Sequence, residues 1–405
     1  MAVALTAPET LHAVRGVRVA TISAGIKKKA GASDLVLFEL AQGSTCAAVF
    51  TRNLFCAAPV TVAKAHLQNN VPRYLLINAG NANAGTGARG MEAAIECCAL
   101  VANAAGCDTA QVLPFSTGVI GEHLPLEKFH AAIPKVFAAL DENAWLDAGR
   151  GIMTTDTVLK GYSKIFQLGN KTATITGIAK GSGMIHPDMA TMLAYIATDA
   201  AVSSAALNAM LLKSIDKSFN AITVDGDTST NDACVLMATG KLGNQPIRQS
   251  GGDYEQLLAA VQDVCMYLAQ AIVRDGEGAT KLITLDVMHA VSEQAAKTIA
   301  FTIAHSPLVK TALFASDPNW GRILAAVGRA GVAIDINRIK IFIGDVCIVE
   351  NGGRAAAYTE DQGKAVMADS EINIRVDLSA GNASARVWTC DFSYDYVKIN
   401  AEYRT

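Results

Sequence analysis

Apolar residues along the chain follow two alternating spacings, one typical of β-strands and the other of α-helices. Short runs rich in branched and aromatic residues predict strands at 34–40, 45–50, 74–78, 172–178 and 193–198. Longer stretches with apolar residues three and four positions apart predict helices at 90–105, 125–140, 203–218 and 254–274. The first of these helices is expected to end at Gly106, because glycine is common just after a helix C-terminus.

The last third of the chain continues this alternation. Further strands are predicted at 281–287, 339–344, 371–378 and 385–390, and further helices at 307–314 and 322–327. Gly381 and Asn382 predict a hairpin turn between the last two strands. Strands and helices mixed along the whole chain favour an α/β fold of layered sheets flanked by helices.

Length and composition add a domain expectation. A chain of 405 residues, 51% of them apolar, is long for one compact unit, so we expect a main lobe and a smaller C-terminal lobe. The boundary is placed near 286–287, where a predicted strand runs into a new helical pattern.

Charge and cysteine usage exclude several classes of protein. The net charge is −3 and no block of five like charges occurs, so no nucleic-acid-binding face is expected. The nine cysteines include no CxxC pair, which favours reduced, buried thiols in a cytoplasmic protein. The N-terminus does not have the pattern of a signal peptide, and no run of 18 apolar residues predicts a membrane span.

The stretch from Lys180 to Leu193 carries the first candidate chemistry. Two glycines and a proline precede Ala190-Thr191, which stands at the start of an apolar run. If the bond between Ala190 and Thr191 breaks, the new α-amine of Thr191 becomes a base for its own hydroxyl, since such amines have a pKa near roughly 7.7–8.0. The alternative is that Thr191 is only the first residue of a strand.

A second stretch, from Pro114 to Gly121, contains Ser-Thr-Gly between apolar residues. Thr117 and Gly118 could direct hydrogen-bond donors at one point and form an oxyanion hole. The alternative is an ordinary turn.

Two more polar stretches are candidates for binding an amino-acid substrate. The first, from Ile152 to Thr157, offers hydroxyls including that of Thr155; its alternative is a helix cap at Thr155 or Asp156. In the second, glycines flank Glu277, whose carboxylate could receive an ammonium group; its alternative is an exposed turn at a helix end.

Two stretches imitate known motifs and fail their criteria. The run from Ile222 to Asp232 is acidic, but Thr230 and Leu236 occupy the places where a calcium loop needs Gly and Glu, so we expect a polar turn and no metal. The run 85–90 fits GxGxxG, but it lies too far from the preceding strand for a dinucleotide site.

Taken together, these stretches resemble the ornithine acetyltransferase family, the bifunctional glutamate N-acetyltransferase/amino-acid acetyltransferase of arginine biosynthesis. The resemblance covers essentially the whole chain. It is carried by the segments 50–53, 78–84, 116–118, 154–157, 180–185, 190–193, 223–232, 276–281, 316–322 and 400–405.

The resemblance implies a role for each matching residue. Thr191 is implied as the nucleophile left after self-cleavage at Ala190/Thr191, with Thr117 and Gly118 as the oxyanion pair. The residues implied in substrate binding are Thr155, Lys180, Thr191, Glu277, Asn400 and Thr405. Cleavage would leave fragments 1–190 and 191–405, in which 191–286 completes the main lobe and 287–405 forms the C-terminal lobe.

The implied reaction moves acetyl from N2-acetylornithine to glutamate through an acetyl ester on Thr191. The resemblance implies no cofactor, and it leaves acetyl-CoA open as a second donor. It also implies that the two fragments associate into a heterotetramer with two copies of each. The alternative from the same nucleophile is a self-cleaving amidohydrolase or aminopeptidase, in which water releases the acyl group. The C-terminal segment Asn400–Thr405 argues for the transferase.

Overall fold

The first sheet is built entirely from the N-terminal part of the chain. The computed structural model describes residues 2–186 and 192–402. Strands β1 (Val17–Ile22), β2 (Leu35–Leu40), β4 (Tyr74–Asn81) and β5 (Val112–Val119) form this sheet in the order β1-β2-β4-β5. Only β4 and β5 run parallel, so their carboxyl ends meet at one edge.

The second sheet combines strands from both sides of the predicted cleavage bond. Its order is β3-β9-β8-β7-β6. Its strands are β3 (Thr45–Phe50), β6 (Lys160–Leu168), β7 (Lys171–Lys180), β8 (Leu193–Thr198) and β9 (Ala233–Ala238). The pair β8 and β9, which follows the bond, therefore lies between β3 on one side and β7 and β6 on the other.

The two sheets pack face to face through an apolar layer. The ring of Phe38 on β2 lies 5.4 Å from those of Trp145 and Tyr195, and Phe115 on β5 lies 5.3 Å from Tyr195. Trp145 begins α4 (Trp145–Ile152) and Tyr195 is on β8. Aromatic contacts of this kind contribute about 0.5–1.5 kcal/mol beyond their buried area.

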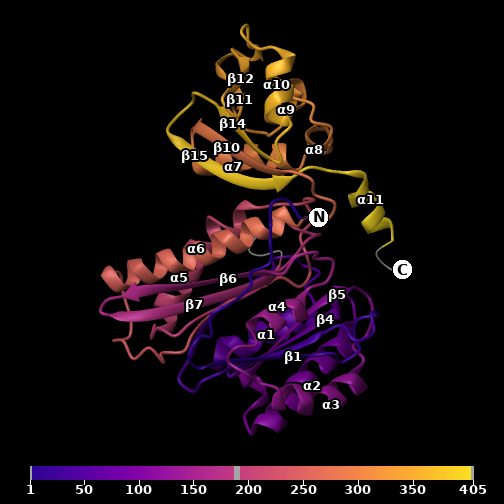
Figure 1. Ribbon diagram of the computed structural model, residues 1–405, viewed down its shortest axis with the longest axis vertical. Coiled ribbons are helices and arrows are strands. Elements are labelled where there is room, and N and C mark those ends of the chain that lie inside the picture. Colours follow the sequence, from indigo (N-terminus) through magenta and orange to yellow (C-terminus); the bar gives the residue numbers. More distant parts are fainter. Residues whose placement is uncertain (1, 187–191, 403–405) are drawn as a thin grey trace.

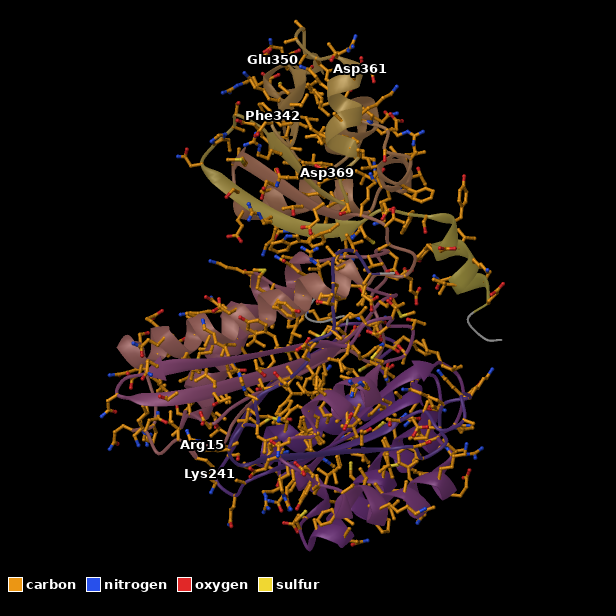
Figure 2. The ribbon with its side chains drawn as sticks, in the orientation of Figure 1. Arg15, Lys241, Phe342, Glu350, Asp361 and Asp369 are labelled. Atoms are coloured by element: carbon orange, nitrogen blue, oxygen red, sulfur yellow. The ribbon has the colours of Figure 1, made fainter. Side chains whose placement is uncertain are left out.

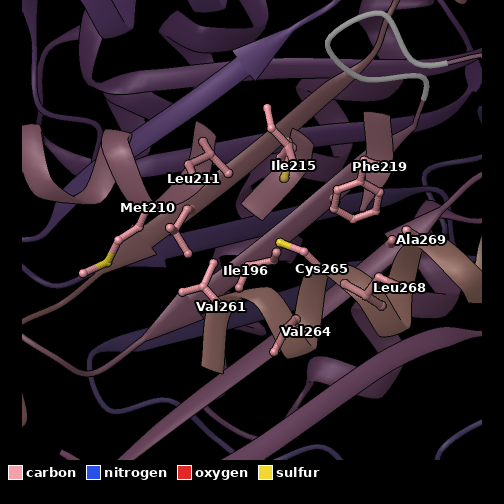
Figure 3. Packing of buried hydrophobic residues seen from close by; sticks show 14 of the residues in the cluster. Ile196, Met210, Leu211, Ile215, Phe219, Val261, Val264, Cys265, Leu268 and Ala269 are labelled. Carbon is pink, nitrogen blue, oxygen red and sulfur yellow. The ribbon is translucent and has the colours of Figure 1, made fainter. Parts of the chain in front are cut away.

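Helices cover the outer face of each sheet. Helices α2 (Gly87–Ala105) and α3 (Leu126–Ala138) cover the first sheet, and α1 (Ala58–Asn69) packs against β5. Helices α5 (Ser204–Asp216) and α6 (Gly252–Arg274) cover the second, where apolar side chains of both helices meet Ile196 of β8 (Figure 3). The result is a helix–sheet–sheet–helix layering (Figure 1), which confirms the expected α/β class of layered sheets.

A third sheet with its own core forms the C-terminal part (Figures 1 and 2). Its order is β13-β12-β11-β14-β10-β15. Its strands are β10 (Leu282–Ala290), β11 (Lys340–Ile343), β12 (Val346–Glu350), β13 (Gly353–Arg354), β14 (Glu371–Asp377) and β15 (Ala383–Cys390). Its helices are α7 (Glu293–Ala304), α8 (Pro307–Phe314), α9 (Trp320–Gly328) and α10 (Glu360–Met367), and α11 (Tyr394–Ala401) follows β15. Figure 2 shows Phe342, Glu350 and Asp361 in this part, far from Arg15 and Lys241.

One local expectation was wrong. Gly381 and Asn382 do not close a hairpin, because β14 and β15 do not pair with each other. Strand β10 lies between them, parallel to β14 and antiparallel to β15. The backbone N–H of Gly381 donates to the carbonyl of His289 at 2.8 Å, so this turn wraps around the end of β10.

The expected lobe boundary near 286–287 falls inside β10, which pairs along its length within the third sheet. As a division into domains, the boundary stays a prediction.

Among the described residues, α6 has the length and apolar composition that could cross a membrane. However, 61% of its most apolar stretch is buried inside the protein, as is typical of the core helices of folded proteins.

Candidate active site

Two strand ends from different sheets meet at the centre of the site. Thr117 lies near the end of β5 in the first sheet, and Lys180 is the last residue of β7 in the second. The Lys180 ammonium donates a hydrogen bond to Thr117 Oγ1 at 3.2 Å. Lys180 is only 9% exposed. Burial lowers the pKa of its ammonium, although the charge of Asp156 works in the opposite direction.

The end of β5 is an irregular strand, not the ordinary turn that was the alternative. Asn81 on β4 lies opposite both Thr117 and Val119, so the pairing slips by a residue. Gly118, between them, has φ 131°, and a Cβ there would lie 2.3 Å from the carbonyl carbon of Gly80. Only glycine fits this position, so the close approach of β4 and β5 requires glycine at residue 118.

A small cavity of about 30 Å³, here called the inner cavity, lies beside these strand ends. Its lining includes Thr117 and Lys180, and also Met192, where the described chain resumes after the predicted cleavage bond. Ala190 and Thr191 themselves lie outside the described residues, as does Thr405. The inner cavity therefore brings together the predicted oxyanion threonine, the predicted lysine and the chain just after the cleavage bond.

The inner cavity also contains polar residues that the sequence analysis assigned to a polar turn. Asp232 is 3% exposed, and its Oδ2 has no hydrogen-bond partner among the described residues. Burial raises the pKa of Asp232 well above its usual value, against the opposing effects of a hydrogen bond from Ser229 and the charge of Lys180. Asn231 donates to the carbonyls of Ala82 at 2.6 Å and Ser116 at 2.9 Å, which holds the end of β5 in place. The signals in the sequence were a polar run directly before an apolar strand and the place of that run, 223–232, among the segments that carry the family resemblance.

The remaining predicted residues gather around a second cavity of about 600 Å³, here called the outer cavity. Thr155 and Glu277 line it, together with residues of α11. Glu277 is 6% exposed, and its Oε2 accepts a hydrogen bond from Nδ2 of Asn400 at 2.8 Å. Thus Thr155 and Glu277, which are far apart in the sequence, line one cavity, and Asn400 contacts Glu277 beside it.

The segment 181–183 separates the two cavities. Ser182 lines the outer cavity, and Gly181 and Gly183 line the inner one. A Cβ on Gly183 would lie 2.4 Å from the carboxylate of Glu277. The backbone of this segment is therefore a thin wall, and glycine at 183 allows Glu277 to approach the inner cavity.

Beneath this wall lies a buried ionic network. The Lys160 ammonium contacts Asp156 and Asp275 at 2.6 Å each, and all three side chains are at most 1% exposed. Asp156 also accepts a hydrogen bond from Gly181 N at 2.8 Å. Burial alone would raise the pKa of Asp156, but Lys160, Lys180 and the Gly181 N–H hold that pKa well below its usual value.

The alternative for the Ile152–Thr157 stretch was a helix cap. In the structure, this stretch takes part in the buried ionic network instead. The segment is irregular from Met153 to Leu159, and Lys160 begins β6. Asp156 therefore holds the Gly181 backbone and pairs with Lys160 instead of capping a helix.

Among residues 2–186 and 192–402, no group of three or more His, Cys, Asp or Glu side chains is arranged to hold an ion. Thr117, Lys180, Glu277 and Asn400 instead supply hydroxyl, ammonium, carboxylate and amide groups, which suit a small polar substrate.

Comparison with known proteins gives the family. The model of the ArgJ family matches residues 18–405. A relative named "Arginine biosynthesis bifunctional protein ArgJ", from Pseudomonas fluorescens, is 56% identical over 407 aligned residues and is covered, like this chain, over 100% of its length.

Two solved structures carry related names. The crystal structure of the arginine biosynthesis bifunctional protein ArgJ from Bacillus halodurans is 39% identical, covering 51% of this chain and 97% of that chain, with a TM-score of 0.49. The ornithine acetyltransferase of Mycobacterium tuberculosis, complexed with ornithine, is 33% identical, covering 45% of this chain and 96% of that chain, with a TM-score of 0.39. Because both TM-scores are below 0.5, the assignment rests on the sequence comparisons. The full-length identity and the family model together establish that this chain belongs to the ArgJ family.

Proposed function

We propose that this member of the ArgJ family, an acyltransferase of arginine biosynthesis, transfers an acetyl group from N2-acetylornithine to glutamate through an ester on Thr191. The observation that carries the proposal is the meeting of Thr117, Lys180 and Met192 at the inner cavity. Met192 directly follows the predicted nucleophile in the sequence.

The nucleophile arises by self-cleavage. The hydroxyl oxygen of Thr191 attacks the carbonyl carbon of Ala190, and the bond from that carbon to the Thr191 nitrogen breaks. The hydroxyl proton passes to this nitrogen, which becomes the free α-amine. Water then hydrolyses the new ester, leaving a carboxylate on Ala190 and restoring the Thr191 hydroxyl.

Acetyl transfer follows in two half-reactions. The Thr191 hydroxyl attacks the acetyl carbonyl of N2-acetylornithine, while its α-amine takes the proton and later delivers it to the departing ornithine amine. Thr117 and Gly118 stabilise the negative oxygen of each tetrahedral intermediate. The α-amine of glutamate then attacks the ester and releases N-acetylglutamate.

Substrate binding divides between the two cavities. Lys180 pairs with the α-carboxylate common to both amino acids, since a buried ammonium makes a strong hydrogen bond to a carboxylate. Glu277 and Thr405 bind the ornithine ammonium, and Thr155 and Asn400 complete the pocket around the outer cavity. The hydrogen bond from Asn400 to Glu277 supports this arrangement.

The reaction needs no cofactor, because acetyl passes between two amines of similar basicity, and acetyl-CoA is proposed as a second donor to glutamate. The two fragments stay together and pair further into a heterotetramer in the cytoplasm. The full-length match to bifunctional ArgJ proteins does not favour the amidohydrolase or aminopeptidase alternative.

The decisive measurement is the intact mass of the purified protein beside a Thr191→Ala variant. Fragments meeting at Ala190/Thr191 in the wild type, with one full-length species in the variant, are expected. Ornithine release should then depend on glutamate. Release at the same rate without glutamate would indicate hydrolysis, and a full-length wild type would remove Thr191 as an N-terminal nucleophile.

A further inference from the structure

A single loop holds the backbone just before the predicted cleavage bond. The loop consists of residues 223–228, here called the clamp loop, and the backbone that it holds consists of residues 184–186. His186 is the last described residue before that bond. The clamp loop belongs to the polar run 222–232, which was expected to form a turn, and the acetyl-transfer mechanism does not use it.

Asp225 provides the main contact of the clamp loop. Its Oδ2 accepts the N–H of Met184 at 2.6 Å, and its Oδ1 accepts the N–H of Ile185 at 2.9 Å. Met184 has φ 55°, a left-handed backbone that non-glycine residues adopt only at a cost. One carboxyl group that accepts two consecutive N–H groups offsets this cost and fixes the direction of the chain.

The carbonyl groups of the same segment are held as well. The Ile185 carbonyl accepts from Val224 N at 2.8 Å and from Thr223 Oγ1 at 2.7 Å. The His186 carbonyl accepts from Thr228 Oγ1 at 3.1 Å. These bonds and those of Asp225 give partners to two N–H and two C=O groups in three residues.

The His186 ring is fixed from the C-terminal part of the protein. It lies 4.3 Å from the ring of His305 and 5.1 Å from that of Phe301. His305 Nε2 is 3.2 Å from Thr223 Oγ1, so the ring contact and the clamp loop support each other.

The same stretch of chain also holds the far side of the cleavage bond. Met192 accepts a backbone hydrogen bond from Ala233 N at 2.9 Å, and Leu193 lies opposite Ala233 in the second sheet. The clamp loop is itself anchored, because Thr223 N donates to the Trp388 carbonyl at 3.0 Å. Residues 222–233 therefore fix both flanks of the five residues 187–191.

We infer that the clamp loop aligns the Ala190–Thr191 bond for self-cleavage, with Asp225 as the principal positioning residue. The inference rests on the proposed function. Attack by Oγ on the preceding carbonyl needs both groups in one narrow geometry. The clamp loop holds the chain before the bond and Ala233 of β9 holds the chain after it, which lowers the entropy lost in reaching that geometry. Asp225 acts through the backbone of Met184 and Ile185, whose N–H groups it accepts.

The test follows the conversion of freshly translated full-length chain into fragments 1–190 and 191–405 by intact mass. Asp225→Ala should slow this conversion at least about tenfold, since small misplacements cost up to about a hundredfold. Asp225→Asn, which keeps one acceptor oxygen, should be intermediate. The matched control is Asp227→Ala, since Asp227 lies two residues away in the same loop with an exposed side chain, and it should cleave like the wild type.

Folding is separated from positioning by comparing melting temperatures in the Thr191→Ala background, where no chain can be cleaved. A slowed variant with an unchanged melting temperature supports the inference. If Asp225→Ala does not fold, Thr223→Val decides, because it removes only the hydroxyl bonds to Ile185 and His305. It should also slow cleavage.

If Asp225→Ala is cleaved at the wild-type rate, the positioning role is overturned and the proposed function is left intact. The same holds for Thr223→Val if Asp225→Ala does not fold. A wild type that never cleaves would overturn both. A third outcome is that Asp225→Ala is fully cleaved, but its fragments have less acetyl-transfer activity than the same amount of wild-type fragments. Asp225 would then act in the transfer reaction and not in cleavage, which would also overturn the inference.

Discussion

Lys160 shows how much of the site depends on one buried side chain. Its ammonium neutralises Asp156 and Asp275, and Asp156 in turn holds the backbone of Gly181 at the wall between the cavities. A buried pair of this kind adds little net stability compared with apolar residues, but breaking it leaves charges unpaired.

Lys160→Met should therefore destabilise the protein by about 3–5 kcal/mol, because two buried carboxylates lose their partner. The measurement is urea unfolding, with Lys164→Met as control. Lys164 pairs with Asp263 at the surface, where a salt bridge contributes about 0–1 kcal/mol. Equal losses in the two variants would contradict the structural role of the network.

Lys180 offers a prediction for binding and its pH dependence. Lys180→Ala should raise KM for N2-acetylornithine roughly tenfold or more, since a hydrogen bond to a charged group contributes about 1.5–3 kcal/mol. Burial lowers the pKa of Lys180, so in the wild type the ammonium is lost and KM rises at a pH below its usual 10.5. The rise should be absent in Lys180→Ala. A normal KM in that variant, measured beside the exposed-lysine control Lys164→Ala, would exclude the carboxylate contact.

At the scale of elements, the C-terminal arm after β15 connects the third sheet to the outer cavity. Asp391 accepts the N–H groups of Thr280 at 2.8 Å and Lys281 at 2.9 Å, and the Ser393 hydroxyl donates to the Gly278 carbonyl at 2.6 Å. These bonds hold the arm against the loop that carries Glu277. Helix α11 then extends beyond the main body with no buried residue of its own (Figure 1).

This arrangement predicts that Asn400 matters for substrate binding and hardly at all for folding. Asn400→Ala should raise KM about tenfold, because Glu277 loses the hydrogen bond that orients its carboxylate toward the substrate. The melting temperature should be unchanged, because Asn400 is exposed. Val397→Ala on the same helix, where the side chain is exposed, is the control. A large fall in melting temperature would instead show that the Asn400–Glu277 bond is mainly structural.

At the scale of the whole molecule, the second sheet determines whether the two fragments stay together after self-cleavage. Strands β8 and β9, from fragment 191–405, lie between β3 and β7 from fragment 1–190. A further link is the bond from Arg15 Nε to Asp199 at 2.8 Å, on the side of the molecule where Arg15 and Lys241 lie together (Figure 2). Cutting the chain between Ala190 and Thr191 breaks none of these contacts.

The cleaved protein should therefore elute as one species containing both fragments, at the same volume as uncleaved Thr191→Ala. In urea the two fragments should unfold in one cooperative transition, because neither contains the complete second sheet. Size-exclusion chromatography with mass analysis of each fraction makes the measurement. Fragment 1–190 eluting alone under native conditions would contradict the interleaved sheet.

The sequence by itself determined the layered α/β class and many of its elements, because apolar spacing is a local property. It also singled out Thr117, Lys180 and Glu277 by their unusual neighbours, and the structure brings their stretches together at two adjoining cavities. The self-cleavage at Thr191 and the roles of individual site residues stay predictions.

Tertiary structure decided what local patterns could not encode. Lys160 and Asp275 form an ion pair although they are 115 positions apart in the sequence. Strand β10 lies between β14 and β15, which the sequence predicted to form a hairpin. Likewise, the clamp loop binds the backbone of Met184 and Ile185, which precede it by about 40 positions in the sequence. The free energy of such contacts comes from burial and from partners that only the folded chain supplies, so spacing along the sequence carries no record of them.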